Sequence, residues 1–321
     1  MLSKNSIEKM IYLIKKSYIL IAAFVFLIFT NTNSIENKII YKINNEIITS
    51  IDVQNEIYYL TALNPNLKNL DYKEIVEISK KSIIREKIKR IEISNQFNNA
   101  KAPIEFLENL VKNIYSKIGI NNLDEFKEYL KVNKVDYKNV LKKIETEALW
   151  NELIVMKFSK KVKIDQNKLR DKIIKNKSIE NKSYLMSEIV FEVSKADELE
   201  EKYKEIIEAI NNNGFDNAAL KYSISETANL GGKLNWINEK SLNKKILNAL
   251  NLIKKNEFTE PIAVPGGFII LLINDIEIKK TDKNIENELK KFIAESNNNQ
   301  LNQFSKIYFN KIKEDMEINE I

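Results

Sequence analysis

The chain has 321 residues, of which 44% are hydrophobic and 30% are charged, and its formal net charge is +6. It contains neither cysteine nor histidine, which excludes thiol nucleophiles, Ser-His-Asp triads, histidine-ligated zinc and imidazole acid–base chemistry within the chain. The length allows two or three domains with hydrophobic cores of their own.

The first 34 residues have the pattern of an export signal. Four lysines lie within residues 1–16, and a nearly unbroken apolar run follows over residues 17–29. The run is shorter than the roughly 20 residues that span a bilayer, so it predicts a cleaved signal peptide and a periplasmic protein. The alternative is an uncleaved N-terminal anchor, because no Ala-x-Ala cleavage site follows the run.

Residues 35–182 are predicted to be mainly helical. Asn44 and Asn45 separate two short apolar runs and predict a hairpin over residues 39–49. Thr49 or Ser50 can cap the helix that follows. Apolar spacing and capping residues predict further helices over these ranges: 72–97, 103–119, 122–130 and 136–153. Residues 160–182 are expected to form a polar helical connection capped by Asp165.

Residues 183–278 alternate between strand-like and helix-like patterns. The predicted order is a strand at 184–191, helices at 199–210 and 215–222, a strand at 233–237, a helix at 242–253 and a strand at 268–276. Gly231-Gly232 and Pro265-Gly266-Gly267 mark the turns. This order predicts a small antiparallel sheet packed against helices.

The end of the chain is predicted to return to its beginning. A helix opened by Asp282 continues to Ile312, and residues 316–321 alternate like an edge strand. Neither element can bury its apolar side alone, and the N-terminal helices are the natural partner. The predicted fold class is α+β, with a mainly helical N-terminal domain completed by the C-terminal helix and with the middle unit inserted.

The middle unit resembles the parvulin, or PpiC-type, prolyl isomerase domain. The residues that carry this resemblance, in chain order, are Phe215-x3-Ala219, Gly231-Gly232-x3-Trp236, Phe258-x2-Pro261-Ile262 and Gly267-Phe268. The whole chain is similar to the SurA-type periplasmic chaperones in the 39–53 segment, the helices to about Lys161 and the C-terminal helix and strand. That family often has two parvulin units, and this chain has room for one.

The resemblance implies four segments: a signal peptide or anchor at 1–34, a SurA-like helical domain at 35–182, a parvulin-like domain at 183–279, and a C-terminal helix and strand at 280–321 that pack on the helical domain.

The resemblance also implies where a prolyl isomerase site would lie. Parvulins build this site from two histidines and a Cys or Asp, and these positions fall here on Glu188, Ser225 and Ile269. All three are substituted, so weak or no catalysis is expected. The family's proline-gripping positions fall on three residues that remain apolar: Leu234, Leu242 and Ile246.

Three of these residues have simpler alternatives. Leu242 and Ile246 could be ordinary core residues of one helix, and Glu188 could be a solvated strand residue instead of a polar group at the mouth of the recess.

Three functional hypotheses follow. The first is an ATP-independent periplasmic chaperone that binds unfolded exported or outer-membrane polypeptides and carries a degenerate isomerase site. The second is an active peptidyl-prolyl cis-trans isomerase, and the third is a membrane-tethered assembly factor of the PpiD kind. We expect no cofactor, metal or nucleic acid partner, because no phosphate loop or metal cluster is evident and charges of both signs alternate along the helices. A membrane partner is expected only if the N-terminal segment is uncleaved.

Overall fold

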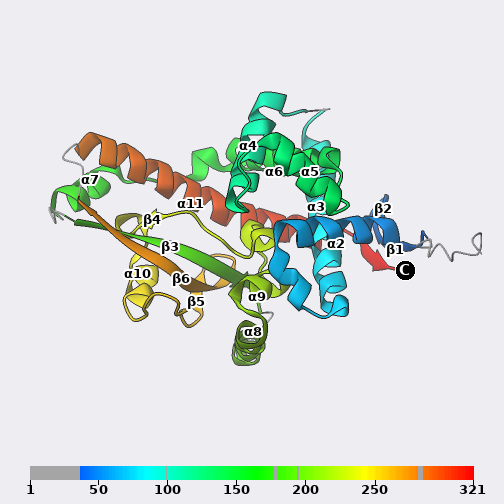
Figure 1. The fold of residues 1–321 in the computed structure, drawn as a ribbon. Coiled ribbons are helices and arrows are strands. Elements are labelled where there is room, and N and C mark those ends of the chain that lie inside the picture. Colours follow the sequence, from blue (N-terminus) through cyan, green and yellow to red (C-terminus); the bar gives the residue numbers. More distant parts are fainter. Residues whose placement is uncertain (1–36, 99, 176–179, 194, 281–284) are drawn as a thin grey trace, which may run out of the picture. The chain divides into compact units, whose positions relative to one another are not determined.

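The computed structural model of the protein describes residues 37–98, 100–175, 180–193, 195–280 and 285–321 (Figure 1). The predicted signal peptide or anchor at 1–34 lies outside these residues. None of the helices in the described ranges has both the length and the apolar character that a bilayer crossing requires.

The described chain alternates long helices with short strands. The helices are α2 (Ser50–Leu63), α3 (Tyr72–Gln96), α4 (Ile104–Lys117), α5 (Leu123–Val132), α6 (Tyr137–Phe158), α7 (Gln166–Lys175), α8 (Leu199–Asn213), α9 (Phe215–Tyr222), α10 (Lys244–Leu250) and α11 (Ile285–Glu314). The strands are β1 (Ile39–Ile43), β2 (Glu46–Thr49), β3 (Glu180–Phe191), β4 (Ile237–Asn238), β5 (Ile262–Val264), β6 (Gly267–Lys280) and β7 (Ile318–Glu320). The fold class is therefore α+β, as predicted.

A three-stranded antiparallel sheet brings together the two ends of the described chain, in the order β2-β1-β7. Asn44 has a φ of 50° and makes the tight turn between β1 and β2. Ile43 pairs with Glu46 on one side and with Ile318 on the other. The backbone N–H of Ile321 donates to the carbonyl of Ile40 at 3.0 Å.

Helix α11 packs against the N-terminal helices through a shared hydrophobic core. Leu301 and Ile312 of α11 belong to the same buried cluster as Ile88 of α3 and Leu153 of α6. Trp150 of α6 is fully buried and its indole N–H donates to Ser305 Oγ of α11 at 2.9 Å. The C-terminal helix therefore completes the helical part of the fold.

A four-stranded antiparallel sheet, in the order β4-β3-β6-β5, forms the middle of the chain. Strands β3 and β6 pair along their whole length, from Glu180 with Lys280 to Phe191 with Phe268. Successive side chains of each strand point to opposite faces of the sheet. Met186 and Leu271 pack on the α10 side, whereas Ile189 packs with α8 and α9 on the other side.

Three sequence predictions in this region were wrong in their limits. The polar connection was expected to stay helical to Lys182, but α7 ends at Lys175 and β3 already begins at Glu180, because polar residues there pair with the end of β6. Residues 233–237 were expected to form a strand, yet only Ile237 lies in one, and Lys233 makes an isolated bridge to Ser187. The helix expected at 242–253 is the shorter α10, which Asn243 caps.

Candidate functional site: a recess in the four-stranded sheet

A buried carboxylate lies at the centre of the candidate site. Glu188 of β3 is only 7% exposed. Its Oε1 accepts a hydrogen bond from Ser225 Oγ and another from Thr227 Oγ1 at 3.0 Å. Its Oε2 lies 3.5 Å from the Nζ of Lys306, which comes from α11. A buried charge needs such partners, since an unpaired one would cost several kcal/mol, on the order of the desolvation penalty.

The loop between α9 and β4 is fixed to β3 by backbone hydrogen bonds. The N–H of Ile224 donates to the carbonyl of Val190 at 2.7 Å, and the N–H of Glu188 donates to the carbonyl of Gly232 at 2.8 Å. Gly232 has a φ of +75°, and a Cβ built on it would lie 2.2 Å from the carbonyl oxygen of Glu188. This close approach needs glycine, and it explains the Gly231-Gly232 pair in the sequence.

Helix α3 holds the same loop from the other side. The guanidinium of Arg85 donates to the carbonyl of Ser225 at 2.8 Å and to the carbonyl of Ser223 at 2.9 Å. Ser82 Oγ lies 3.3 Å from Oδ1 of Asn229. The helical part of the protein therefore positions the backbone that carries Ser225.

Beside the Glu188 cluster lies a recess of about 290 Å³ with mixed walls. Its apolar lining residues are Met186, Leu234, Ile237, Leu242, Ile246, Val264, Ile269 and Leu271. Glu188, Ser225 and Thr227 form part of its polar edge, and residues of α11 form another part. The recess can hold a compact apolar side chain and present polar groups to the backbone that carries it.

All six residues that the sequence singled out line this recess. Glu188 and Ser225 contact each other through their side chains, and Ile269 is 7% exposed on the neighbouring strand β6. The alternative in which Glu188 is a solvated strand residue was wrong, because the hydroxyls of the α9–β4 loop and Lys306 enclose its carboxylate. Leu242 and Ile246 are half-buried and pack on the core of the sheet while lining the recess, so the two interpretations of these residues are compatible.

Two polar residues that contact Glu188 were missed from the sequence. Thr227 lies two residues after Ser225, and its short polar side chain gives no signal that separates it from any loop threonine. Lys306 lies in the last helix, outside the stretch that resembles a parvulin. Its place on the α11 face that turns toward the sheet depends on how α11 packs, which a sequence pattern does not specify.

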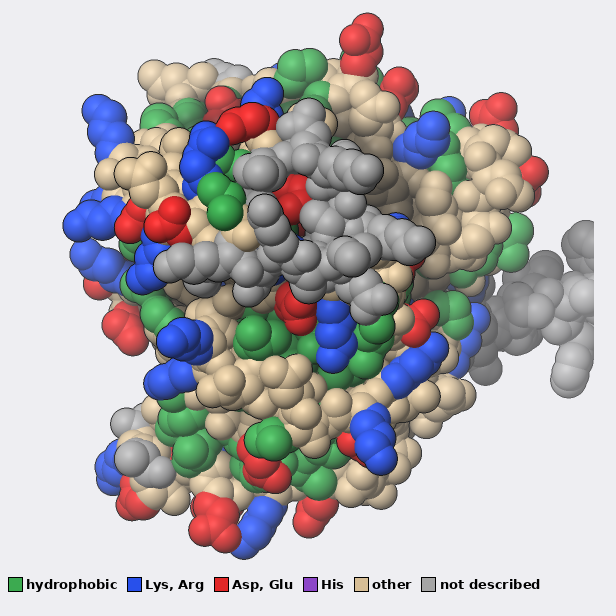
Figure 2. All heavy atoms as spheres, turned by 90° about the vertical axis from the view of Figure 1, so that its left-hand side faces the viewer, with side chains coloured by type: hydrophobic (Ala, Val, Ile, Leu, Met, Phe, Trp, Pro, Cys, Tyr) green, Lys and Arg blue, Asp and Glu red, His purple; other side chains and the backbone are tan. Residues whose placement is uncertain are grey.

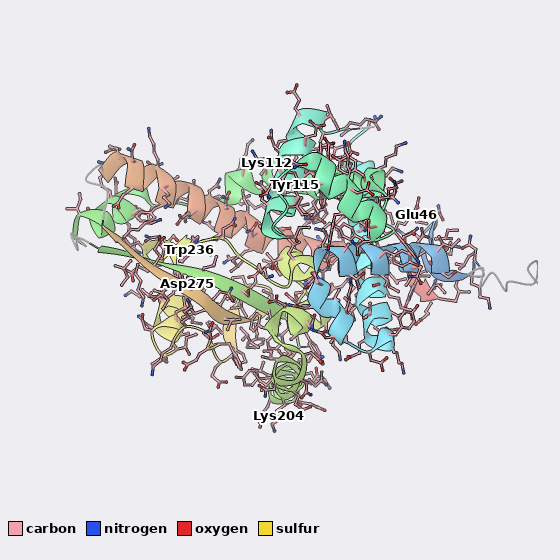
Figure 3. All side chains as sticks on the ribbon, in the orientation of Figure 1. Glu46, Lys112, Tyr115, Lys204, Trp236 and Asp275 are labelled. Atoms are coloured by element: carbon pink, nitrogen blue, oxygen red, sulfur yellow. The ribbon has the colours of Figure 1, made fainter. Side chains whose placement is uncertain are left out.

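A second concave surface lies on the helical part. It has a volume of about 310 Å³, and Phe106, Leu110 and Ile114 of α4 line it together with Leu230 from the α9–β4 loop. Phe106 is 49% exposed. Figure 3 labels Lys112 and Tyr115 of the same helix, of which Tyr115 is buried against Phe126. We call this surface the α4 groove.

Comparison with known families identifies the middle of the chain. A model of the rotamase family, described as a PPIC-type PPIase domain, matches residues 186–275. The chain carries a PPIC-type domain. The apolar part of the recess comes entirely from this PPIC-type domain, from its four strands, the α9–β4 loop and the segment that leads into and includes α10.

Solved structures with similarity to this chain include whole proteins and single domains. A structure from work on PEB4 and Cj1289, two SurA-like chaperones of Campylobacter jejuni, shares 16% identity over 89% of this chain and 99% of that chain, with a TM-score of 0.34. PrsA from Bacillus subtilis shares 13% identity over 86% and 92%, with a TM-score of 0.29. The parvulin domain of PpiD from E. coli shares 21% identity over 30% and 91%, with a TM-score of 0.25. No curated protein matches the sequence.

The described residues contain no group of three or more His, Cys, Asp or Glu side chains placed to hold a metal ion. Figure 2 shows basic and acidic side chains interspersed over one face of the protein, with hydrophobic side chains between them.

Proposed function

We propose that this protein is an ATP-independent chaperone of exported polypeptides, and that the recess of its PPIC-type domain takes up apolar side chains of an unfolded chain. The observation that supports this function is the recess itself. Its apolar walls, including Leu234, Leu242 and Ile246, are intact beside a polar edge. A volume of about 290 Å³ lies at the low end of the range for small-molecule pockets, and it suits one side chain of a longer ligand.

The α4 groove supports the same proposal from the helical part. Contiguous exposed apolar side chains on a folded protein mark surfaces that bind other chains. Phe106 is exposed at this groove and Leu110 and Ile114 are half-buried there, although α4 buries Leu107 and Val111 on its inner face. An unfolded polypeptide offers many apolar residues along its length, so two separate sites can engage one client.

The proposed clients are unfolded outer-membrane proteins and other exported polypeptides, and the proposed compartment is the periplasm. These follow from the N-terminal lysines and apolar run and from the SurA-type resemblance of the sequence. We also propose the domain limits 35–182, 183–279 and 280–321 for the exported chain.

The proposal includes weak or absent isomerase activity. An isomerase must lower a rotational barrier of roughly 18–20 kcal/mol by favouring the twisted amide over the planar one. Ile269 offers no polar group at one of the three positions where parvulins place one. Glu188 and Ser225 are already hydrogen-bonded to each other, so their capacity to bind a twisting amide is reduced.

Active isomerisation is the second candidate function, and the hydrogen-bonded cluster of Glu188, Ser225 and Thr227 favours it. A protease-coupled assay on a proline peptide separates the two candidates. Rates equal to the uncatalysed reaction are expected; a rate enhancement that Ser225→Ala abolishes would establish catalysis instead.

The experiment that tests the chaperone function is aggregation of a denatured outer-membrane protein with increasing amounts of the full chain. We expect suppression at near-stoichiometric ratios without ATP. Phe106→Ser is expected to weaken suppression, whereas Lys112→Ser on the same helix is the matched control. No suppression by the wild-type protein would refute the proposal.

A membrane-tethered factor of the PpiD kind remains the third candidate, and it depends on residues outside the described ranges. Release of the protein from membranes without detergent would refute it.

A further inference from the structure

The C-terminal helix α11 forms one wall of the recess, although it lies outside the residues that match the PPIC-type family. Ser296, Asn299, Gln303 and Lys306 all line the recess. Their spacing of three, four and three residues places them on one face of the helix. In Figure 1, α11 runs alongside β3 and β6 toward β1.

This face of α11 is polar, whereas the opposite face is apolar. Leu301 and Ile312 are buried in the core shared with the N-terminal helices. The α11 residues that line the recess are instead a serine, four carboxamide residues and a lysine. A helix face that served only to cover the apolar recess would be expected to be apolar too, since burial of apolar surface drives such contacts.

The recess also remains open beneath α11. A volume of about 290 Å³ is left between the helix and the sheet, so no side chain of α11 fills it. Gln300 uses both ends of its carboxamide on the backbone of Lys163, at 3.0 Å each. Within the described part of the chain, no hydrogen bond is found for the side chains of Asn299 and Gln303.

Lys306 is placed to contact both Glu188 and a ligand. Its side chain is 14% exposed, and its Nζ is 3.5 Å from Glu188 Oε2. Charge-assisted hydrogen bonds are normally about 2.7–2.9 Å long, so this ion pair leaves N–H groups of the ammonium for another acceptor. A lysine has three such donors and no acceptor.

We propose that the recess is a composite polypeptide site, in which the PPIC-type domain holds an apolar side chain and α11 binds the backbone of the same residue. This inference rests on the proposed function. Lys306 donates to a backbone carbonyl of the bound segment, and Asn299 and Gln303 pair with neighbouring backbone groups. A buried backbone needs such partners, because each residue carries one donor and one acceptor. The ligand is an extended segment with a compact aliphatic residue or proline between small neighbours.

The test uses the full chain and a fluorescein-labelled decapeptide with one Leu-Pro pair in an Ala/Ser/Gly background, measured by fluorescence anisotropy. Lys306→Met keeps the aliphatic stem and removes the ammonium, so we expect about tenfold weaker binding, the loss of one hydrogen bond to a charged group. Lys306→Arg is expected to retain most of the affinity. Lys311→Met, an exposed lysine elsewhere on α11, is the matched control and should bind like the wild type.

A second variant tests the site in case Lys306→Met does not fold. The double variant Asn299→Ala/Gln303→Ala removes the two carboxamides that the proposal assigns to the ligand, and we expect about threefold weaker binding at an unchanged thermal midpoint. If Lys306→Met does not fold, the double variant decides whether the composite site exists: an affinity of the double variant equal to that of the wild type would overturn the composite site. A decapeptide with Ala-Ala in place of Leu-Pro should lose binding in the wild type.

The outcomes separate this inference from the proposed function. If the wild type does not bind the Leu-Pro peptide and does not suppress aggregation, the proposed function fails. If the wild type binds and Leu242→Ala weakens binding while Lys306→Met does not, the function stands and the composite site is wrong. Tighter binding by Lys306→Met would also overturn it, because α11 would then compete with the ligand.

Discussion

Truncation of Trp150 is expected to destabilise the protein strongly, because this side chain joins α6 to α11. Trp150 is fully buried. Its ring stacks on Tyr308 at a centroid distance of 5.8 Å and meets Phe309 edge-on at 6.2 Å. Both partners lie on α11, which is also the helix that lines the recess.

The expected magnitude follows from these contacts. Replacement of a buried tryptophan by alanine costs about 3–5 kcal/mol in transfer and cavity energy. Loss of the hydrogen bond to Ser305, 2.9 Å long, adds about 1 kcal/mol. We therefore expect Trp150→Ala to lower the free energy of unfolding by about 4–6 kcal/mol, and Trp150→Phe by about 1–2 kcal/mol because most of the apolar volume remains.

Urea unfolding followed by circular dichroism measures this loss. Trp236 is the second tryptophan of the chain and is 41% exposed just before β4 (Figure 3). Trp236→Phe is therefore the control, with an expected change within about 0.5 kcal/mol, and it leaves Trp150 as the only fluorescent indole. A Trp150→Ala variant within 1 kcal/mol of the wild type, on the order of a surface change, would refute the packing of α11 on α6.

Three further changes test the site and its surroundings. Gly232→Ala would place a Cβ 2.2 Å from the carbonyl oxygen of Glu188, so we expect the free energy of unfolding to fall by about 3 kcal/mol or more, measured by thermal unfolding. Gly119 has a φ of +79° and open space around it, so Gly119→Ala, the control, should lower this free energy by only about 1 kcal/mol. Arg85→Met removes the donors to the carbonyls of Ser223 and Ser225, so we expect the free energy of unfolding to fall by about 2 kcal/mol and peptide binding to weaken. Arg90 is exposed on the same helix, and Arg90→Met is the control that should bind the peptide like the wild type. Burial and the hydrogen bond to Glu92 raise the pKa of Tyr308. The stabilisation by its neutral hydroxyl is therefore complete below about pH 10 and is lost as the pH rises further. Tyr308→Phe should reduce the slope of stability against pH between about 10 and 12 by up to about 1.4 kcal/mol per unit, and an unchanged slope would contradict this assignment.

Local signals in the sequence were sufficient for most helix starts and for the hairpin. Thr49 forms a capping box with Asp52, and Asn122 and Asp136 cap the helices that they were expected to cap. Each of these signals acts within three or four residues along the chain, where the backbone N–H groups at a helix start need acceptors. Such signals do not depend on the rest of the fold.

Elements that depend on distant partners were predicted less well. The start of β3 is polar, with Asn181 and Lys182 among its residues, and it is a strand because β6 continues alongside it. Conversely, Leu234 to Trp236 have strand-like composition, but only the backbone N–H of Leu234 pairs with β3, at Met186. Strand formation depends more on neighbouring strands than on intrinsic preference.

The residues of the candidate site likewise include some that the sequence could place and one that it could not. The positions of Glu188, Ser225 and Ile269 could be placed because a known domain pattern fixes their spacing, and the structure places all three at one recess. Lys306 could not be placed, because nothing in its local sequence relates it to β3. Its proximity to Glu188 depends on α11 packing against both the N-terminal helices and the recess.

The position of the recess wall therefore depends on contacts far from the recess. Trp150, Tyr308 and Leu301 hold the inner face of α11 against the helical part, while Arg85 of α3 holds the loop that carries Ser225. Both the wall and the polar edge of the site are thus positioned by the N-terminal helices. An isolated PPIC-type domain would keep the apolar part of the recess and lack Lys306, so the activity of the domain alone and that of the full chain need not be the same.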